Sequence, residues 1–285
     1  MKLSKLPISR RSLGLVAAMI GTVSLAIGAH AALSLRALDA AKAVATDQGA
    51  DNVKKGGHLA LIIGNGHYPD ASEPLSQPIN DARALTDTLR RDGFDVDVVE
   101  DAGKDDMVRA IDRLKAKIRR DSVVMLFFGG YGVQVGRESY MIPVDAVIWK
   151  ETDVRHEGVS IESVLNVMKE KGARAKLVVV DASRRNPYER RFRAFSHGLA
   201  PISAPDNALI LTSATPGKVV EDSKADNSVL VGELLSHMTA KSVGAEAVFN
   251  KTRVAITRAS DGEQVPSVSS SLLEDVRFGS DTAGS

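Results

Sequence analysis

The sequence of 285 residues lacks cysteine entirely and is poor in aromatic residues. Without cysteine the chain can form no disulfide, no thiolate metal site and no thiol nucleophile. Aromatic residues make up 4% of the chain, and its formal net charge is +1. Proteins that bind nucleic acid present a strongly basic surface, and those that bind single strands add aromatic stacking platforms. We therefore expect no nucleic-acid partner.

Nothing in the sequence indicates a metal or a cofactor. The histidines are scattered and do not have the spacing of a metal site. The acidic run between residues 100 and 106 lacks the spacing of a calcium loop and is typical of a solvated turn before a helix. His67 lies close to the end of the first predicted strand, so a catalytic role for this histidine stays open.

The N-terminal segment predicts export. Four basic residues precede an apolar run over residues 13–30, and Ala29-His30-Ala31 has the small-x-small pattern of a cleavage site. This is the layout of a secretory signal peptide over residues 1–31, and Ser9-Arg10-Arg11 also resembles a twin-arginine signal. We expect a periplasmic protein. The alternative is an uncleaved segment that anchors the chain in the inner membrane through residues 13–30.

The remaining chain is predicted to form one domain. Residues 32–56 are rich in alanine and charge, which is typical of a linker or a loosely held helix. No internal repeat follows, so we expect a single domain over residues 57–279 and a polar tail over residues 280–285.

Strand and helix patterns alternate within this domain. Strands are predicted over residues 58–65, 94–99, 123–128, 177–181 and 208–213, and a hairpin follows the third of them, through Gly136 to Ile142. Helices are predicted over residues 80–93, 105–118, 160–171, 228–239 and 245–259, and residues 184–193, which include five arginines, are predicted to form an exposed loop. This alternation predicts an α/β fold with a mostly parallel sheet covered by helices on both faces.

Polar side chains follow two of the predicted strands directly. The strand over residues 177–181 ends in Asp181-Ala-Ser183, and the strand over residues 123–128 is followed by Gly129-Gly130-Tyr131-Gly132. Ligands and catalytic groups of open α/β sheets lie beyond the carboxyl ends of such strands. We therefore expect Tyr131 and Ser183 to face one another at this edge of the sheet.

Several motifs, in one order, resemble the caspase-like superfamily in its bacterial metacaspase and orthocaspase branch. The matching motifs include Leu61-Ile-Ile-Gly-Asn65, Gly130-Tyr-Gly-Val-Gln134, Tyr140-Met-Ile-Pro-Val-Asp-Ala146, Asp181-Ala-Ser-Arg184, Ala214-Thr-Pro-Gly217 and Gln264-Val-Pro266. The resemblance implies a caspase-like three-layer α/β/α sandwich and membership of a family of cysteine-type endopeptidases.

The resemblance also identifies the catalytic positions, and both are altered. The family uses a histidine to activate a cysteine, and backbone amides stabilise the oxyanion. Here the histidine position holds Tyr131 and the cysteine position holds Ser183, while Gly132 lies at the position of an oxyanion amide. Tyrosine has a reference pKa of about 10 and is protonated at neutral pH, so it makes a poor base for a serine hydroxyl. The two hydroxyls can instead hydrogen-bond each other and fill the site.

Two acidic positions of the family are kept. In metacaspase-like relatives, acidic residues at the positions of Asp81 and Asp181 line a pocket for an arginine or lysine side chain. A pair of carboxylates can hold such a side chain through charge-assisted hydrogen bonds. The alternatives are a helix cap for Asp81 and a structural carboxylate, held by loop amides or Arg184, for Asp181.

These features predict an exported caspase-like pseudopeptidase that has lost its catalytic dyad. We expect it to bind peptides or a protein partner through a basic residue, with no cofactor. One alternative is an active hydrolase directed to arginine or lysine, with Ser183 as its nucleophile. Another is a purely structural interaction module whose cleft is filled.

Overall fold

The computed structural model describes residues 57–69, 74–184, 188, 199–219, 225–239 and 243–278. The predicted signal peptide, the linker, the tail and most of the arginine-rich loop lie outside these residues. Within the described part of the chain, no helix has both the length and the apolar character needed to cross a membrane.

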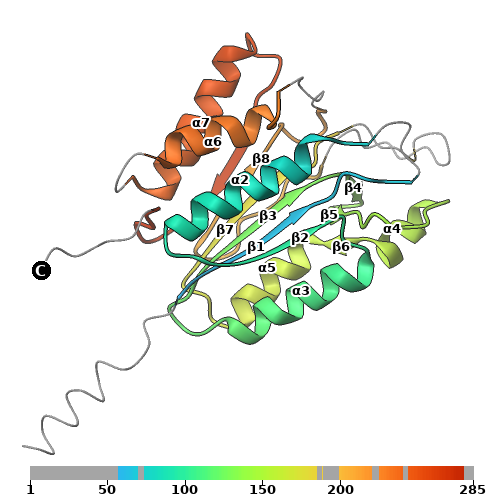
Figure 1. The fold of residues 1–285 in the computed structure, drawn as a ribbon, viewed down its shortest axis with the longest axis horizontal. Coiled ribbons are helices and arrows are strands. Elements are labelled where there is room, and N and C mark those ends of the chain that lie inside the picture. The colour runs from blue at the N-terminus through green and yellow to red at the C-terminus, as the bar shows by residue number, and fades with distance from the viewer. Residues whose placement is uncertain are drawn as a thin grey trace, which may run out of the picture. The chain divides into compact units, whose positions relative to one another are not determined.

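A central sheet of six strands forms the middle of the domain (Figure 1). In spatial order the strands are β2 (Asp95–Glu100), β1 (His58–Gly64), β3 (Val123–Gly129), β7 (Ala175–Asp181), β8 (Ala208–Thr212) and β9 (Ser267–Ser270). All neighbouring pairs are parallel except β8 and β9, which are antiparallel. The predicted mostly parallel sheet is confirmed.

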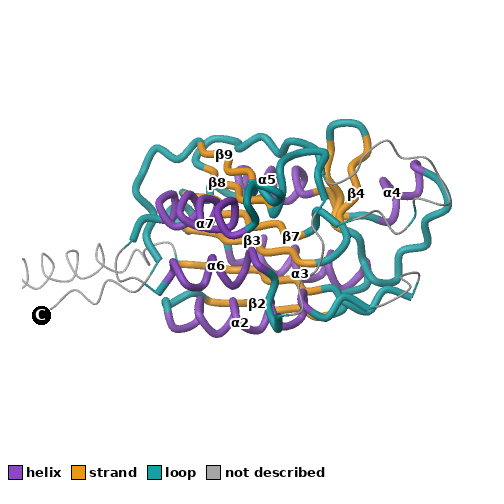
Figure 2. The backbone as a smooth tube through the Cα atoms, turned by 90° about the horizontal axis from the view of Figure 1, so that it is seen from above, coloured by secondary structure: helices purple, strands orange, loops and turns teal. Residues whose placement is uncertain are grey.

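Helices cover both faces of this sheet (Figures 1 and 2). The helices α2 (Gln77–Arg91), α6 (Val229–Met238) and α7 (Ala245–Ala259) contribute to one hydrophobic cluster, and α3 (Lys104–Lys117) and α5 (Ile161–Glu170) contribute to the other. The two clusters lie on opposite faces of the sheet, as expected for a three-layer α/β/α sandwich.

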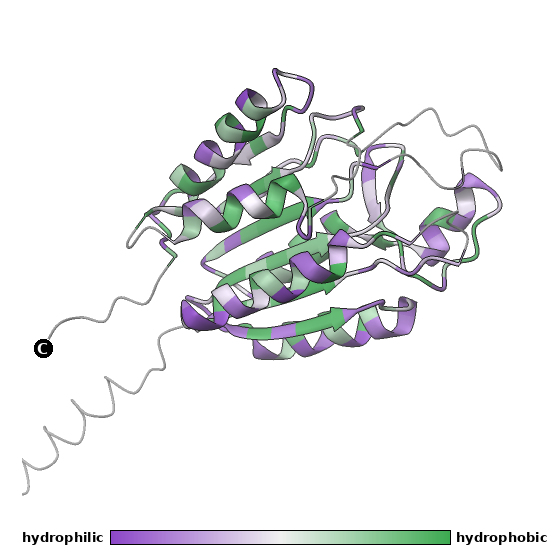
Figure 3. Cartoon of the chain, turned by 45° about the horizontal axis from the view of Figure 1, so that its top comes forward, coloured by the Kyte–Doolittle hydropathy of each residue, from purple (hydrophilic) through white to green (hydrophobic). Residues whose placement is uncertain are grey.

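The two clusters follow from the alternation of side chains along each strand. In β3, Val123, Met125 and Phe127 belong to the cluster beneath α2, α6 and α7. Val124, Leu126 and Phe128 belong to the cluster beneath α3 and α5. Because both faces are covered, the central strands consist almost entirely of apolar residues (Figure 3), which is why their positions could be predicted from composition.

A second, smaller sheet extends from the end of β3. It contains β4 (Gly132–Val135), β5 (Glu138–Met141) and β6 (Val159–Ser160) in that order, and α4 (Glu151–Glu157) precedes β6. The predicted hairpin corresponds to β4 and β5. The sequence patterns did not predict β6, α4 or β9. The reason is their small apolar content: α4 buries only Val154, and β9 is a short serine-rich strand.

The start of α2 differs from the prediction. The helix begins at Gln77 rather than near Asn80, with Pro78 in its first turn, where a missing N–H costs nothing. This first turn packs closely on the end of β1: a Cβ atom at Gly64 would lie 2.4 Å from the Pro78 carbonyl oxygen. Asp81 therefore lies inside the helix and not at its N-cap.

Phe127 in β3 tests this description of the core. Its side chain is fully buried between the sheet and α2. Phe127→Ala leaves a cavity and should lower the free energy of unfolding by about 3–5 kcal/mol. Urea unfolding measures this change. Leu273→Ala, at a side chain that is 83% exposed, serves as the control and should change stability by less than about 0.5 kcal/mol. Equal effects of the two substitutions would contradict this account of the core.

Candidate functional site

The carboxyl ends of β3 and β7 form the floor of the site. Gly129 and Asp181 are the last paired residues of these strands. Beyond them, the Gly130 N–H donates to the Asp181 carbonyl and the Gly132 N–H donates to the Ala182 carbonyl, each over 3.2 Å. The two segments therefore stay side by side past the end of the sheet, and Tyr131 lies across from the Asp181-Ala182-Ser183 segment.

Tyr131 is held by its backbone and by the neighbouring Tyr68. Its N–H donates to the Tyr68 hydroxyl over 3.1 Å, and its carbonyl accepts from the Ile142 N–H over 3.0 Å. The two tyrosine rings meet edge to face, with their centroids 4.8 Å apart. Gly130 precedes with φ of +155°, and a Cβ there would lie 2.5 Å from the Tyr68 hydroxyl oxygen, so this position requires glycine.

Ser183 is buried, with 1% of its surface exposed. Lys176, which could make Tyr131 a better base, is near the start of β7, where its ammonium donates to the Ala173 carbonyl over 3.2 Å. The opposite end of the strand carries Ser183. This position confirms that Lys176 is too far along β7 to act at the dyad.

Arg184 corrects the prediction of an exposed loop. Its side chain is buried, and its Nη1 donates to the carbonyls of Gly130, over 3.1 Å, and of Asp181. The guanidinium thus links the chain after β3 to the end of β7. Tyr188 is buried as well, and the remaining arginines of the loop lie outside the described residues.

The Gly132 N–H already donates a hydrogen bond within the protein. Its N–H donates to Ala182, and a Cβ at Gly132 would lie 2.6 Å from a Leu199 methyl group and 2.9 Å from the Ala182 Cβ. An oxyanion could accept from this amide only if the bond to Ala182 opened. The oxyanion role of Gly132 stays a prediction.

Asp181 and Asp81 come from different layers and are both buried. Side chains alternate along β7, so Asp181 lies on the same face of the strand as Leu177 and Val179, whose side chains lie beneath α2. Asp81 lies on the buried face of α2. Their exposed fractions are 4% and 0%. Strand alternation thus directs Asp181 toward the helix that carries Asp81.

Each carboxylate keeps one oxygen without a hydrogen-bond partner. The Asp81 Oδ1 accepts from the Asn227 side chain over 2.9 Å and from the Ser228 N–H over 3.0 Å. The Asp181 Oδ1 lies 3.8 Å from Arg184 Nη1. The Oδ2 atoms of both aspartates are buried, and among the residues that the structure describes they have no hydrogen-bond partner. A buried polar atom without a hydrogen bond costs folding free energy unless a ligand donates the missing hydrogen bond.

The environment of Asp81 favours its neutral form. Burial raises the pKa of Asp81 to about 6, the negative charge of Asp181 adds to this effect, and the hydrogen bonds from Asn227 and Ser228 oppose it. The influence of Asp181 on this pKa shows that the two carboxylates interact. A positive charge placed between them would favour ionisation of Asp81.

Asp81 is therefore not a cap of its own helix. It accepts instead from the backbone of Ser228, the N-cap residue of α6, and so connects α2 to the start of α6. Sequence reasoning did not identify Asn227 or Ser228 as its partners, because these contacts join residues far apart in the chain.

The histidine and the acidic residues considered above as possible catalytic or calcium-binding groups form surface ion pairs. His67 Nδ1 lies 2.6 Å from Asp101 Oδ2, and the side chain of His67 is largely exposed. Glu100 pairs with Arg83, and Asp106 pairs with Arg109. In the described ranges no three His, Asp or Glu side chains are grouped so that they could hold a metal ion.

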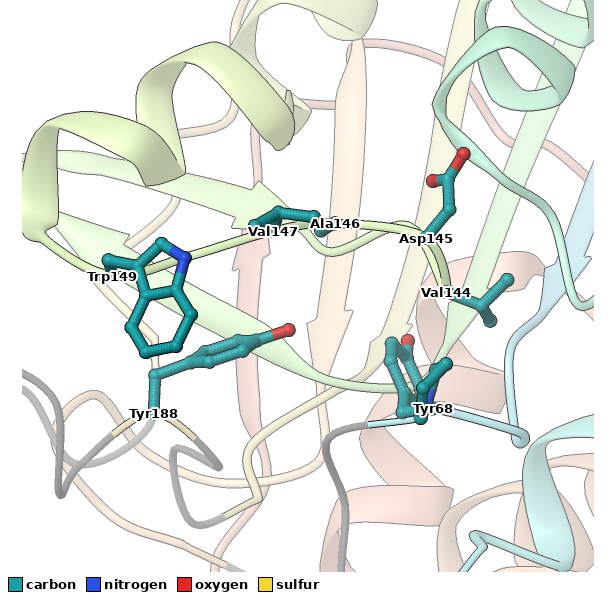
Figure 4. A pocket seen from close by; sticks show the side chains of 8 residues that line it. Tyr68, Val144, Asp145, Ala146, Val147, Trp149 and Tyr188 are labelled. Atoms are coloured by element: carbon teal, nitrogen blue, oxygen red, sulfur yellow. The ribbon is translucent and has the colours of Figure 1, made fainter.

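A small pocket beside Tyr131 was not predicted (Figure 4). Its volume is about 190 Å³, and it is lined by Tyr68, Pro69, Val144, Asp145, Ala146, Val147, Trp149 and Tyr188. The single tryptophan of the chain was the available signal in the sequence. The pocket itself depends on contacts between three separate segments, so sequence patterns could not predict it.

This architecture, with its strand-end site, defines a caspase-like protein. Residues 57–277 match the family model of the caspase domain, and the chain belongs to this family. It is also similar to the human mucosa-associated lymphoid tissue lymphoma translocation protein 1, with 29% identity over 133 residues, which cover 46% of this chain and 16% of that protein. The mouse homolog matches with 29% identity over 133 residues, 46% of this chain and 15% of that protein. The chain therefore spans only a small part of the length of these relatives.

The raised pKa of Asp81 predicts that stability depends on pH. Because folded Asp81 binds its proton more tightly than the unfolded side chain does, stability should fall as pH rises from about 4 to about 6. Asp81→Asn removes this titration and should raise the free energy of unfolding at pH 7.5 by up to about 3 kcal/mol, with little gain at pH 4.

Urea midpoints measured between pH 4 and pH 8 test this dependence. Asp106→Asn, at an exposed surface pair, is the control and should give a small difference from the wild type at every pH. The account of Asp81 is contradicted if Asp81→Asn changes stability equally at pH 4 and at pH 7.5.

Proposed function

We propose that this chain is an exported caspase-like pseudopeptidase that binds a basic side chain of a peptide or protein partner between Asp81 and Asp181. One observation carries the proposal: two buried carboxylates, one of which raises the pKa of the other, each keep an oxygen without a hydrogen-bond partner in the described part of the chain. Natural protein interiors avoid such atoms, and they are common where a ligand completes the site.

A guanidinium or an ammonium group has the chemistry to complete this site. It supplies donors to both free oxygens, and the hydrogen bonds are charge-assisted and poorly screened because the carboxylates are buried. The cation also offsets the two causes that raise the pKa of Asp81, which are its burial and the negative charge of Asp181. Binding should therefore be tightest when both acids are ionised and should weaken as pH falls below about 6.

The changed dyad supports binding without peptide cleavage. Tyr131 and Ser183 replace a base and a thiol, and Lys176 lies at the far end of the strand. The bond between Gly132 and Ala182 occupies an amide that an oxyanion would need. Catalysis through Ser183 would require a different base and a rearranged loop.

Peptide binding tests the acidic pocket. An alanine-based peptide with one central arginine should bind to the wild type, and the same peptide with neutral citrulline should bind at least about tenfold more weakly, since the charged hydrogen bonds are lost. Asp181→Asn should cause a similar loss. Calorimetric titration measures the affinities, with Asp106→Asn as the matched control. Equal binding of the arginine and citrulline peptides would refute the pocket.

Cleavage assays test the loss of catalysis. We expect no hydrolysis of arginine or lysine reporter peptides by the wild type or by Ser183→Ala. Restoring the dyad with Tyr131→His and Ser183→Cys should produce activity if the cleft keeps the geometry of the family. Wild-type activity that disappears in Ser183→Ala would instead establish the alternative, a hydrolase with a serine nucleophile.

A further inference from the structure

A third buried polar atom without a hydrogen-bond partner lies at the same edge of the sheet as the two aspartates. Ser213 directly follows β8, and 0% of its surface is exposed. Among the described residues its Oγ atom has no hydrogen-bond partner, as is also true of the Oδ2 atoms of Asp81 and Asp181. Because a buried hydroxyl without a hydrogen bond costs folding free energy, Ser213 needs the same explanation as the two carboxylates.

The register of β7 and β8 places Ser213 next to Asp181. Val180 pairs with Thr212, so the residues that follow them, Asp181 and Ser213, are neighbours across the two strands. The Ser213 N–H donates to the Val180 carbonyl over 3.1 Å, which shows that the pairing continues to this residue. Neighbouring strands of a sheet lie about 4.8 Å apart, so one ligand group can contact both side chains if they lie on the same face.

The side chain of Ser213 does lie on the same face of the sheet as that of Asp181. Leu209 and Leu211 of β8 belong to the hydrophobic cluster beneath α2, α6 and α7, whereas Ile210 belongs to the cluster on the opposite face. Ser213 follows Leu211 by two positions, so the alternation of side chains directs it to the α2 face. Asp81, Asp181 and Ser213 therefore come from three elements and line one region between the sheet and α2.

The backbone fixes the position of Ser213. The Gln264 side chain donates to the Ser213 carbonyl over 3.0 Å, and the Gln264 N–H donates to the Ser260 hydroxyl over 3.0 Å. On the other side of Asp181, the paired residue of β3 is Gly129, which has no side chain. Ser213 is thus the side chain that adjoins Asp181 across the paired strands, and its hydroxyl is held in place before a ligand binds.

Neither carboxylate presents both of its oxygens to a ligand. The Asp81 Oδ1 already accepts two hydrogen bonds, from Asn227 and Ser228. The Asp181 Oδ1 lies 3.8 Å from the guanidinium of Arg184. A guanidinium binds a carboxylate most strongly through two parallel hydrogen bonds, one to each oxygen. This mode of binding is therefore not available to an arginine ligand at either aspartate.

The remaining acceptors match an ammonium group. An ammonium carries three N–H donors on one nitrogen. The site offers three single acceptors, which are the Oδ2 atoms of Asp81 and Asp181 and the Oγ atom of Ser213. One ammonium can therefore supply a donor to each of the three. It is also more compact than a planar guanidinium, which suits a region where all three side chains are buried.

We infer that Ser213 is a specificity-determining residue of the acidic site: its hydroxyl accepts the third hydrogen bond of a lysine ammonium and makes the site prefer lysine to arginine. The inference rests on the proposed function and narrows its ligand from a basic side chain to a lysine side chain. Because Ser213 is neutral, its substitution changes the number of hydrogen bonds and leaves the charge of the site as it is.

Peptides that differ only in the basic side chain test this preference. The full chain is titrated calorimetrically with alanine-based peptides that carry one central lysine, arginine or trimethyllysine, in which methyl groups replace the three N–H donors and the charge is kept. The lysine peptide should bind about tenfold more tightly than the arginine peptide, since it gains about one charged hydrogen bond. Trimethyllysine should bind at least about tenfold more weakly than lysine, since it has no donors.

A pair of serine variants tests the hydroxyl itself. Ser213→Ala should lower the affinity for the lysine peptide about tenfold and change that for the arginine peptide less than about twofold. Its urea midpoint should stay the same or rise, because a hydroxyl without a partner does not support the fold. Ser139→Ala is the matched control, since Ser139 is equally buried and its Oγ also lacks a partner among the described residues, but it lies in β5 of the smaller sheet. It should leave both affinities unchanged.

The outcomes separate this inference from the proposed function. An arginine peptide that binds as tightly as the lysine peptide, or a lysine preference that Ser213→Ala keeps, would overturn the role of Ser213 and leave the acidic site intact. A lower urea midpoint of Ser213→Ala, with equal losses for both peptides, would assign the hydroxyl to the support of the fold and also overturn the inference. Failure of both peptides to bind to the wild type would overturn the proposed function together with the inference.

Discussion

The continued pairing of β3 and β7 beyond the end of the sheet is the contact on which the rest of the site depends. Two backbone hydrogen bonds and the buried guanidinium of Arg184 hold the Gly130–Gly132 turn against the segment from Asp181 to Ser183. The same contact positions Tyr131 opposite the segment that carries Ser183, and the alternation of β7 directs Asp181 toward α2. Substitutions of Tyr131 or Ser183 can therefore leave the geometry of this edge in place, because two of its contacts are hydrogen bonds between backbone groups.

The acidic pair lowers the stability of the fold. Within the described part of the chain, each aspartate keeps one buried oxygen without a hydrogen-bond partner, and burial of Asp81 beside Asp181 costs folding free energy at neutral pH. A core selected only for stability would replace one acid by a neutral residue. Strained or unsatisfied groups of this kind concentrate at binding sites, where a partner recovers the cost.

Features of the structure that depend on local sequence patterns could be predicted, and features that depend on contacts between distant residues could not. The central strands and α7 were predicted because burial on two faces, or on one helical stripe, leaves a local apolar pattern. The segments carrying Tyr131 and Ser183 follow strands whose shared direction brings their ends together. The burial of Arg184, the contact of Asp81 with Ser228 and the pocket around Trp149 depend instead on residues distant in sequence, which leave no periodic signal. The start of α2 was misplaced because Pro78 begins the helix before its apolar stripe.

Ser183, buried at the end of β7, also determines how the domain responds to oxidants. A thiolate at this position would be the most oxidisable atom of the domain, open to sulfenic acid formation and to mixed disulfides. A hydroxyl has no such chemistry, and the chain has no thiol at any position. This edge of the sheet is therefore not subject to thiol oxidation in either reducing or oxidising surroundings.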